Sequence, residues 1–213
     1  MRIRAVALLT VAGLALAPAA FGLPKRMQTV NLDRDPEPEQ LVVRDIVSGD
    51  PPYQLTQQTA VVQDTCNGQP AAFDLMTEPE DAVVNLKVRE LDGKITPQPE
   101  IWVEALSGAS GRVGVDRVLR YDACAAPRVL FSYDTSAIRP RPPRGYAVSS
   151  WAISFRNRTR RYSGKEIRLD ESLAGRHDAL CCASRRRITY FGYNAGRDRY
   201  VAYSRKIVKV KRR

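Results

Sequence analysis

Hydrophobic and polar residues alternate along much of this 213-residue chain, which is typical of strands that bury one face. The clearest run is 82–91, where Val84, Leu86 and Val88 fall on one face of an extended chain. Turn-forming stretches such as Asn67-Gly68 separate the alternating runs. The pattern predicts strands at 41–47, 55–64, 82–91, 101–105, 113–121, 128–133, 146–155, 187–193, 199–203 and 207–211.

Helical periodicity is weak by comparison, and only 165–175 shows a helical spacing of apolar residues. We therefore predict a mainly β fold: an antiparallel β-rich single domain, sandwich or barrel-like, of roughly eight to ten strands with little helix. A polar N-terminal segment at 20–40 is expected to precede a β-rich domain at 41–213. Within that domain, the Pro/Arg-rich stretch 139–145 is expected to be a loop, because proline lacks the amide donor that a sheet interior requires.

The N-terminus has the features of an export signal. Arg2 and Arg4 supply positive charge, Ala5–Ala17 is largely apolar, and Pro18 lies between small residues that suit cleavage. The alternative is an uncleaved membrane anchor, although the run is short for a span of about 20 residues. We expect a signal peptide at 1–19, no stable membrane span after its removal, and a secreted or cell-envelope protein.

The formal net charge of +11 is unevenly distributed along the chain. Residues 1–24 carry 2 basic and 0 acidic groups (+2), residues 25–138 carry 11 and 18 (−7), and residues 139–213 carry 21 and 5 (+16). Such a basic part suits an anionic envelope polymer or lipid headgroups as partner. Nucleic acid does not fit an exported chain that lacks a recognised binding motif. The alternative is that the excess charge is solvated and has no partner.

An arginine cluster after the strand at 146–155 is the candidate anion site. On an extended chain, Arg156, Arg158 and Arg160 share one face and form a cationic ridge suited to phosphate or carboxylate groups. The alternative is a solvated polar face backed by tyrosines in the core.

Four cysteines, an even number in an exported chain, indicate two disulfides. Adjacent cysteines rarely bond to each other, because the small ring strains the peptide between them. We therefore expect Cys181 and Cys182 to pair outward, one with Cys66 and one with Cys124. Zinc binding is disfavoured, since the chain has no Cys-x-x-Cys motif and a single histidine.

The segment 31–39 has an oxygen-bearing side chain at every second position. The candidate calcium ligands are Asn31, Asp33, Asp35 and Glu39. Calcium takes about six to eight oxygens, which a tight loop can supply. The stretch resembles the Asp-x-Asp-x-Asp-Gly loop that precedes a strand in secreted FG-GAP-type repeat proteins, and this resemblance implies a calcium site. Such families usually have glycine where Arg34 and Pro36 stand, so a metal-free turn is the alternative.

The segment 178–184, Asp-Ala-Leu-Cys-Cys-Ala-Ser, stands before two predicted strands. It resembles the Asp-x-x-Cys-Cys-Pro-Ser segment before a closing hairpin in exported actinobacterial envelope proteins, including LppP/LprE-type lipoproteins. Ala183 replaces the proline of that motif, and no lipid-attachment cysteine follows the signal. The resemblance implies a non-catalytic envelope protein and no particular substrate.

The sequence shows no catalytic constellation. His177 is the only histidine, and no Gly-x-Ser-x-Gly elbow, phosphate-binding loop or dinucleotide fingerprint occurs. We expect a secreted, disulfide-stapled, non-catalytic binding or structural protein, with calcium as its one candidate cofactor. Two alternatives remain: a secreted hydrolase that uses carboxylates or His177, and a binder of anionic polymer or lipid through the basic C-terminal part.

Overall fold

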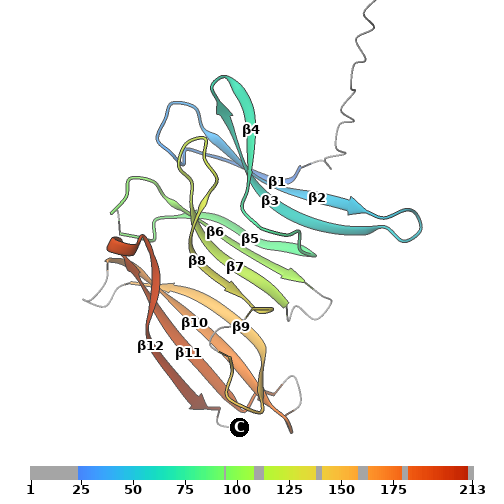
Figure 1. Ribbon diagram of the computed structural model, residues 1–213, viewed down its shortest axis with the longest axis vertical. Helices are drawn as coiled ribbons and strands as arrows, with labels where there is room; N and C mark the ends of the chain where they lie inside the picture. The colour runs from blue at the N-terminus through green and yellow to red at the C-terminus, as the bar shows by residue number, and fades with distance from the viewer. Residues whose placement is uncertain are drawn as a thin grey trace, which may run out of the picture.

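The computed structural model describes residues 24–93, 95–107, 113–137, 141–157, 163–178 and 182–210. Over these residues the protein is mainly β, with twelve strands and one 3₁₀ turn, Ala195–Arg197. The strands form three four-stranded antiparallel sheets, and within the described chain none of them closes into a barrel (Figure 1). The predicted mainly β, antiparallel fold is confirmed.

Each sheet is a meander of four consecutive strands, so neighbours in the sheet are also neighbours in sequence. Sheet A contains β1 (Pro24–Val30), β2 (Glu39–Ser48), β3 (Leu55–Cys66) and β4 (Gln69–Asp74). Sheet B contains β5 (Ala82–Arg89), β6 (Glu100–Ser107), β7 (Val113–Arg120) and β8 (Arg128–Asp134). Sheet C contains β9 (Tyr146–Arg156), β10 (Ser163–Gly175), β11 (Arg185–Asn194) and β12 (Arg199–Lys209).

Sheet B is the central layer and buries both of its faces. On β6, Ile101 and Val103 belong to the hydrophobic cluster shared with sheet A, whereas Trp102 between them belongs to the cluster shared with sheet C. On β7, Leu119 faces sheet A and Val118 faces sheet C in the same way. Alternate side chains point to opposite faces of a strand, so sheet B can contribute to a separate hydrophobic cluster on each of its two faces. The order of packing is therefore A, B, C, as in Figure 1.

The helical spacing of apolar residues at 165–175 does not correspond to a helix, because these residues form most of β10. Its apolar residues Ile167, Leu169 and Leu173 are separated by even numbers, so they share one face of a strand as well as they fit a helix. All three are buried, and two of them pack in the cluster between sheets B and C. Contacts with the neighbouring strands β9 and β11 decide between the two periods.

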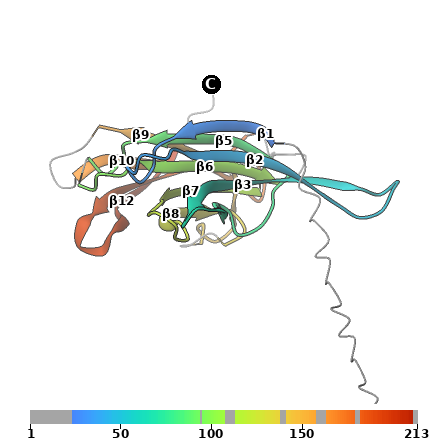
Figure 2. The same ribbon diagram turned by 90° about the horizontal axis from the view of Figure 1, so that it is seen from above.

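A long arm leaves sheet A (Figures 1 and 2). The partner strand β1 pairs with β2 only as far as Arg44, and β4 pairs with β3 only from Val61 onward. The intervening part of the β2–β3 hairpin pairs mainly with itself. The acidic loop described next lies at the opposite end of β2, before Glu39.

Candidate metal centre

The loop between β1 and β2 is shaped by side chains that bond its own backbone. The Asn31 Oδ1 accepts the Arg34 N–H at 2.6 Å, and the Asp33 Oδ1 accepts the Asp35 N–H at 2.9 Å. The Asp35 Oδ1 in turn accepts the Glu37 N–H at 2.7 Å. Arg34 has a φ of 73°, so the sharp turn that a glycine usually makes occurs at an arginine.

These turns bring three carboxylates together. Ligand oxygens of Asp33, Asp35 and Glu39 lie within 4.8 Å of one another. Glu39 is fully buried at the start of β2; its Oε2 accepts the Leu32 N–H, and its Oε1 is buried without a hydrogen-bond partner. The Asp33 Oδ2 is also buried and unpartnered. Two buried carboxylate oxygens without donors are costly unless something positive completes the site.

The electrostatic surroundings of Glu39 are negative. Burial raises the pKa of Glu39 above its usual 4.5, and the charges of Asp33 and Asp64 raise it further against the opposing Leu32 hydrogen bond. Asp64 is a close neighbour because β2 and β3 pair Gln40 with Gln63, which sets the two acids on adjacent strands. Asp33, Glu39 and Asp64 form no ion pair with a lysine or arginine among the described residues. The cluster thus has excess negative charge.

A second group of carboxylates differs from the first because an arginine side chain neutralises it. Glu90, Asp92 and Glu100 also bring their oxygens together, but Arg120 fills that site. Its guanidinium lies 2.9 Å from Asp92 and 3.1 Å from Glu100. A protein cation neutralises this group, whereas the Asp33–Asp35–Glu39 group lacks one within the part of the chain that the structure describes.

Carboxylate oxygens that converge in a loop suit a hard cation, and calcium tolerates the irregular geometry of such a loop. Asp33, Asp35 and Glu39 would hold the ion, and water and backbone carbonyls would complete its coordination. The sequence also predicted Asn31 as a ligand, and the structure gives its side chain bonds to the Arg34 and Asp35 backbone. Pro36 does not prevent the turn, because the positive φ falls two residues earlier.

Sequence reasoning missed two residues beside this cluster, Asp64 and Tyr121. The Tyr121 hydroxyl donates to Asp64 Oδ2 at 2.5 Å, and Tyr121 is fully buried between sheets A and B. Burial and the neighbouring Asp64 raise the pKa of Tyr121, so it remains a neutral donor. No local pattern singles these residues out, since they meet only when the two sheets pack.

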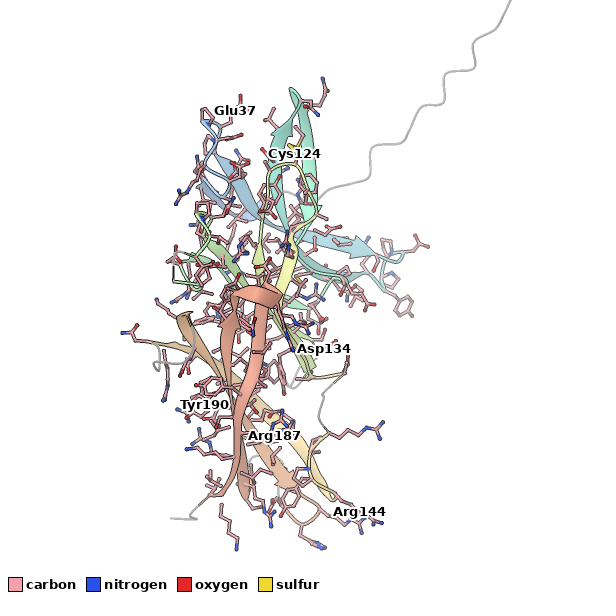
Figure 3. The ribbon with its side chains drawn as sticks, turned by 60° about the vertical axis from the view of Figure 1, so that its left-hand side comes forward. Glu37, Cys124, Asp134, Arg144, Arg187 and Tyr190 are labelled. Atoms are coloured by element: carbon pink, nitrogen blue, oxygen red, sulfur yellow. A yellow bond between two sulfur atoms is a disulfide. The ribbon has the colours of Figure 1, made fainter. Side chains whose placement is uncertain are left out.

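The predicted disulfide pairing is wrong: Cys66 bonds to Cys124, with their Cα atoms 5.5 Å apart. Cys66 ends β3 and Cys124 lies in the turn after β7, so packing of sheet A on sheet B brings them together. The bond lies at the same end of the molecule as the acidic loop, where Figure 3 labels Glu37 and Cys124. Cys182 is exposed, and Cys181 lies outside the described residues.

The predicted arginine ridge is only partly visible. Arg156 is exposed at the end of β9, whereas Arg158 and Arg160 lie outside the described residues. The arginines that the structure gathers on sheet C come from other strands. Arg168 and Arg186, on β10 and β11, both pair with Asp170. The Arg187 side chain instead points inward and makes a buried ion pair with Glu171.

A buried carboxylate between sheets B and C is a further residue that the sequence did not reveal. Asp116 on β7 accepts the indole N–H of Trp102 at 3.0 Å and that of Trp151 at 2.7 Å. Burial raises the pKa of Asp116 to about 6 despite these two hydrogen bonds. The two indoles come from different sheets, so Asp116 ties sheet B to sheet C.

The hydrolase alternative receives no support from His177. It is exposed in the turn after β10. A cavity of about 450 Å³ lies on sheet A and is lined by residues such as Arg44, Thr59 and Asp74, with no histidine among them. His177 therefore does not line this cavity, and the cavity does not provide the nucleophile–histidine pair that the hydrolase alternative requires.

Comparisons with known proteins add no assignment: no protein-family model, curated protein or solved structure matches the chain. The described part of the chain contains no helix that is long and apolar enough to cross a membrane.

Proposed function

We propose that this protein is a non-catalytic extracytoplasmic binding protein whose N-terminal sheet is held together by a calcium ion. The observation that carries the proposal is Glu39, a fully buried carboxylate with an unpartnered Oε1 beside the equally unpartnered Oδ2 of Asp33. A divalent cation would satisfy both oxygens and neutralise the repulsion that Asp33 exerts on Glu39.

The ion would connect the β1–β2 loop to the sheet. Asp33 and Asp35 belong to the loop, and Glu39 belongs to β2. The Cys66–Cys124 bond fastens the neighbouring strand to sheet B. Such disulfides persist in oxidising compartments, which agrees with the export signal expected at 1–19. Together they would stabilise one end of a chain that works outside the cytoplasm.

The test is a thermal melt of the oxidised protein in chelator and then in calcium. A ligand at a hundredfold excess over Kd stabilises the folded state by about 2.7 kcal/mol, which is a rise in Tm of about 5–10 °C for a domain of this size. Glu39→Gln keeps the size of the side chain and removes its charge, so it should abolish the rise. Titration calorimetry should give the same loss of calcium binding.

Glu37→Gln is the matched control. Glu37 lies in the same loop and is exposed, and it donates its backbone N–H to Asp35 Oδ1 at 2.7 Å. This variant should retain the calcium-induced rise. Absence of any rise in the wild-type protein, or a full rise in Glu39→Gln, would overturn the proposal.

A further inference from the structure

The uneven charge of the sequence becomes a spatial polarity in the fold. Among the residues that the structure describes, the part that forms sheet A, 24–81, has 4 basic and 11 acidic residues. The part that forms sheet B, 82–137, has 5 and 7, and the part that forms sheet C, 141–210, has 14 and 5. Because sheet B separates the other two sheets, the acidic and basic parts lie at opposite ends. Figure 3 shows Glu37 and Arg144 at these two ends.

Positive charge gathers where the four strands of sheet C end together. The register pairs Tyr146 with Gly175, Leu173 with Arg185, and Arg185 with Lys209. The start of β9, the end of β10, the start of β11 and the end of β12 are therefore neighbours. We call this surface the basic end, and we define it by five cations of the described chain: Arg144, Arg176, Arg185, Arg186 and Lys209.

The nearby carboxylates leave most of this charge uncompensated. Asp178 is engaged locally, accepting the Gly175 N–H at 2.6 Å and the Ser184 hydroxyl at 2.6 Å. Asp170 pairs with Arg186, and this arginine is still 46% exposed. Arg186 also donates its Nε–H to Asp170 at 2.9 Å, so this arginine is already held by two hydrogen bonds to one carboxylate.

One cation of the basic end is already ordered. The Arg185 guanidinium lies 4.7 Å from the ring centroid of Tyr146, at the start of β9. Stacking on the ring limits the motion of the guanidinium and leaves its planar edge of N–H donors available. Less side-chain freedom is then lost when an anion binds.

We propose that the basic end of sheet C binds a linear polymer that carries phosphate groups along its length. Four of its five cations are arginines, whose forked donors match phosphate oxygens. The cations are spread over four strand ends, and strands lie about 4.8 Å apart, so the surface is about 14 Å wide. A single phosphate reaches one or two of these cations, whereas a polymer can contact most of them. This inference is independent of the calcium site.

The experiment measures binding of the full oxidised protein to linear inorganic polyphosphate, in chelator so that calcium cannot bridge the two. The end variant is Arg176→Gln with Lys209→Gln. The control is Arg197→Gln with Arg199→Gln, which removes the same charge from exposed residues at the β11–β12 turn. The turn lies about 30 Å from the basic end along the ten paired residues of β11. That distance is well beyond the Debye length of about 8 Å at physiological salt.

We expect the end variant to bind polyphosphate about tenfold more weakly, and the slope of log K against log[salt] to become shallower by roughly 1.5, because two contacts are lost. The control should change by less than about twofold. Equal weakening of the two variants would show that only net charge matters and would overturn the proposal. So would the absence of wild-type binding, or equally tight binding of orthophosphate.

Two further probes distinguish other sources of phosphate. Vesicles of phosphatidylglycerol and phosphatidylcholine in equal parts present phosphate on a membrane, and single-stranded DNA presents it beside bases. We expect both to bind more weakly than polyphosphate. Tighter binding to the vesicles would make the basic end a membrane contact, and tighter binding to DNA would make it a nucleic-acid contact; either result would overturn the assignment to a phosphate polymer.

Discussion

Asp116 offers a sharp test of how sheets B and C are joined. It is 1% exposed and accepts one hydrogen bond from each of the two tryptophans in the protein, Trp102 and Trp151. The perturbation is Asp116→Asn, which keeps the shape of the side chain but replaces one acceptor oxygen with an amide NH2 group, a donor. One indole N–H then loses its acceptor, and the buried carboxylate is removed.

The magnitude follows from the pKa of Asp116, which burial raises from 3.8 to about 6. A raised pKa means that the folded protein holds the proton more tightly than the unfolded chain. The contribution of Asp116 to stability is therefore fully present below pH 3.8 and falls as the pH rises to about 6. The loss is about 3 kcal/mol, because each pKa unit corresponds to about 1.36 kcal/mol. The Asp116→Asn variant should not lose this stability as the pH rises, because its side chain does not ionise.

The assay is urea unfolding of both proteins at a series of pH values. We expect the stability of Asp116→Asn relative to wild type to improve by about 3 kcal/mol from acidic to neutral pH. At low pH the variant should be the less stable of the two, because it lacks one acceptor for a buried indole. The other titrating groups are the same in both proteins, so the difference between their free energies of unfolding reports the ionisation of Asp116.

Tryptophan emission gives an independent measurement, since both indoles contact this carboxylate. Wild-type emission should titrate with a midpoint near pH 6, and Asp116→Asn should not titrate there. Asp122→Asn, at an exposed carboxylate, is the control and should leave the midpoint unchanged. An emission midpoint near 4, or a difference in stability that stays constant with pH, would refute the reasoning.

Three other predictions follow from the same structure. Replacing both Cys66 and Cys124 with alanine should lower the free energy of unfolding by about 4 kcal/mol, because the disulfide joins residues that are 58 apart in the sequence. An unchanged urea midpoint of unfolding would contradict this. Gly164→Ala should cost more than about 3 kcal/mol, since a Cβ would lie 2.2 Å from the Leu91 carbonyl oxygen in the β5–β6 loop. Gly68→Ala, with a similar positive φ and open space, should cost about 1 kcal/mol, and equal costs would argue against that close approach. The calcium-induced rise in Tm should shrink as the pH falls towards the raised pKa of Glu39, because only the ionised carboxylate binds the ion; a rise independent of pH would place the ion elsewhere.

Local features of this protein could be predicted from sequence because they depend on near neighbours in the chain. The alternation at 82–91 predicted β5, and the Asn67-Gly68 turn has the positive φ values, 53° and 73°, that a tight hairpin requires. The acidic loop at 31–39 was also recognisable, since oxygen-bearing side chains occupy every second position in it. The segment 165–175 marks the limit, because its apolar spacing suits either period and its neighbours decided the outcome.

Tertiary structure decided the features that bring distant residues together. Cys66 bonds to Cys124, and not to Cys181 or Cys182, because the packing of sheet A on sheet B brings Cys66 and Cys124 together. Burial of Glu39, and its unpartnered oxygen, depend on that same packing. Asp116 is enclosed because sheet C covers the other face of sheet B.

The charge distribution depends on both the sequence and the tertiary structure. The sequence by itself determined that the last 75 residues, 139–213, carry a net charge of +16, since formal charge is a property of composition. It did not determine which cations meet, because Arg176, Arg185 and Lys209 become neighbours only through the register of β10, β11 and β12. Pairing in an antiparallel sheet joins residues that are far apart in the chain, so hydrophobic periodicity specifies strands while register and packing specify the sites.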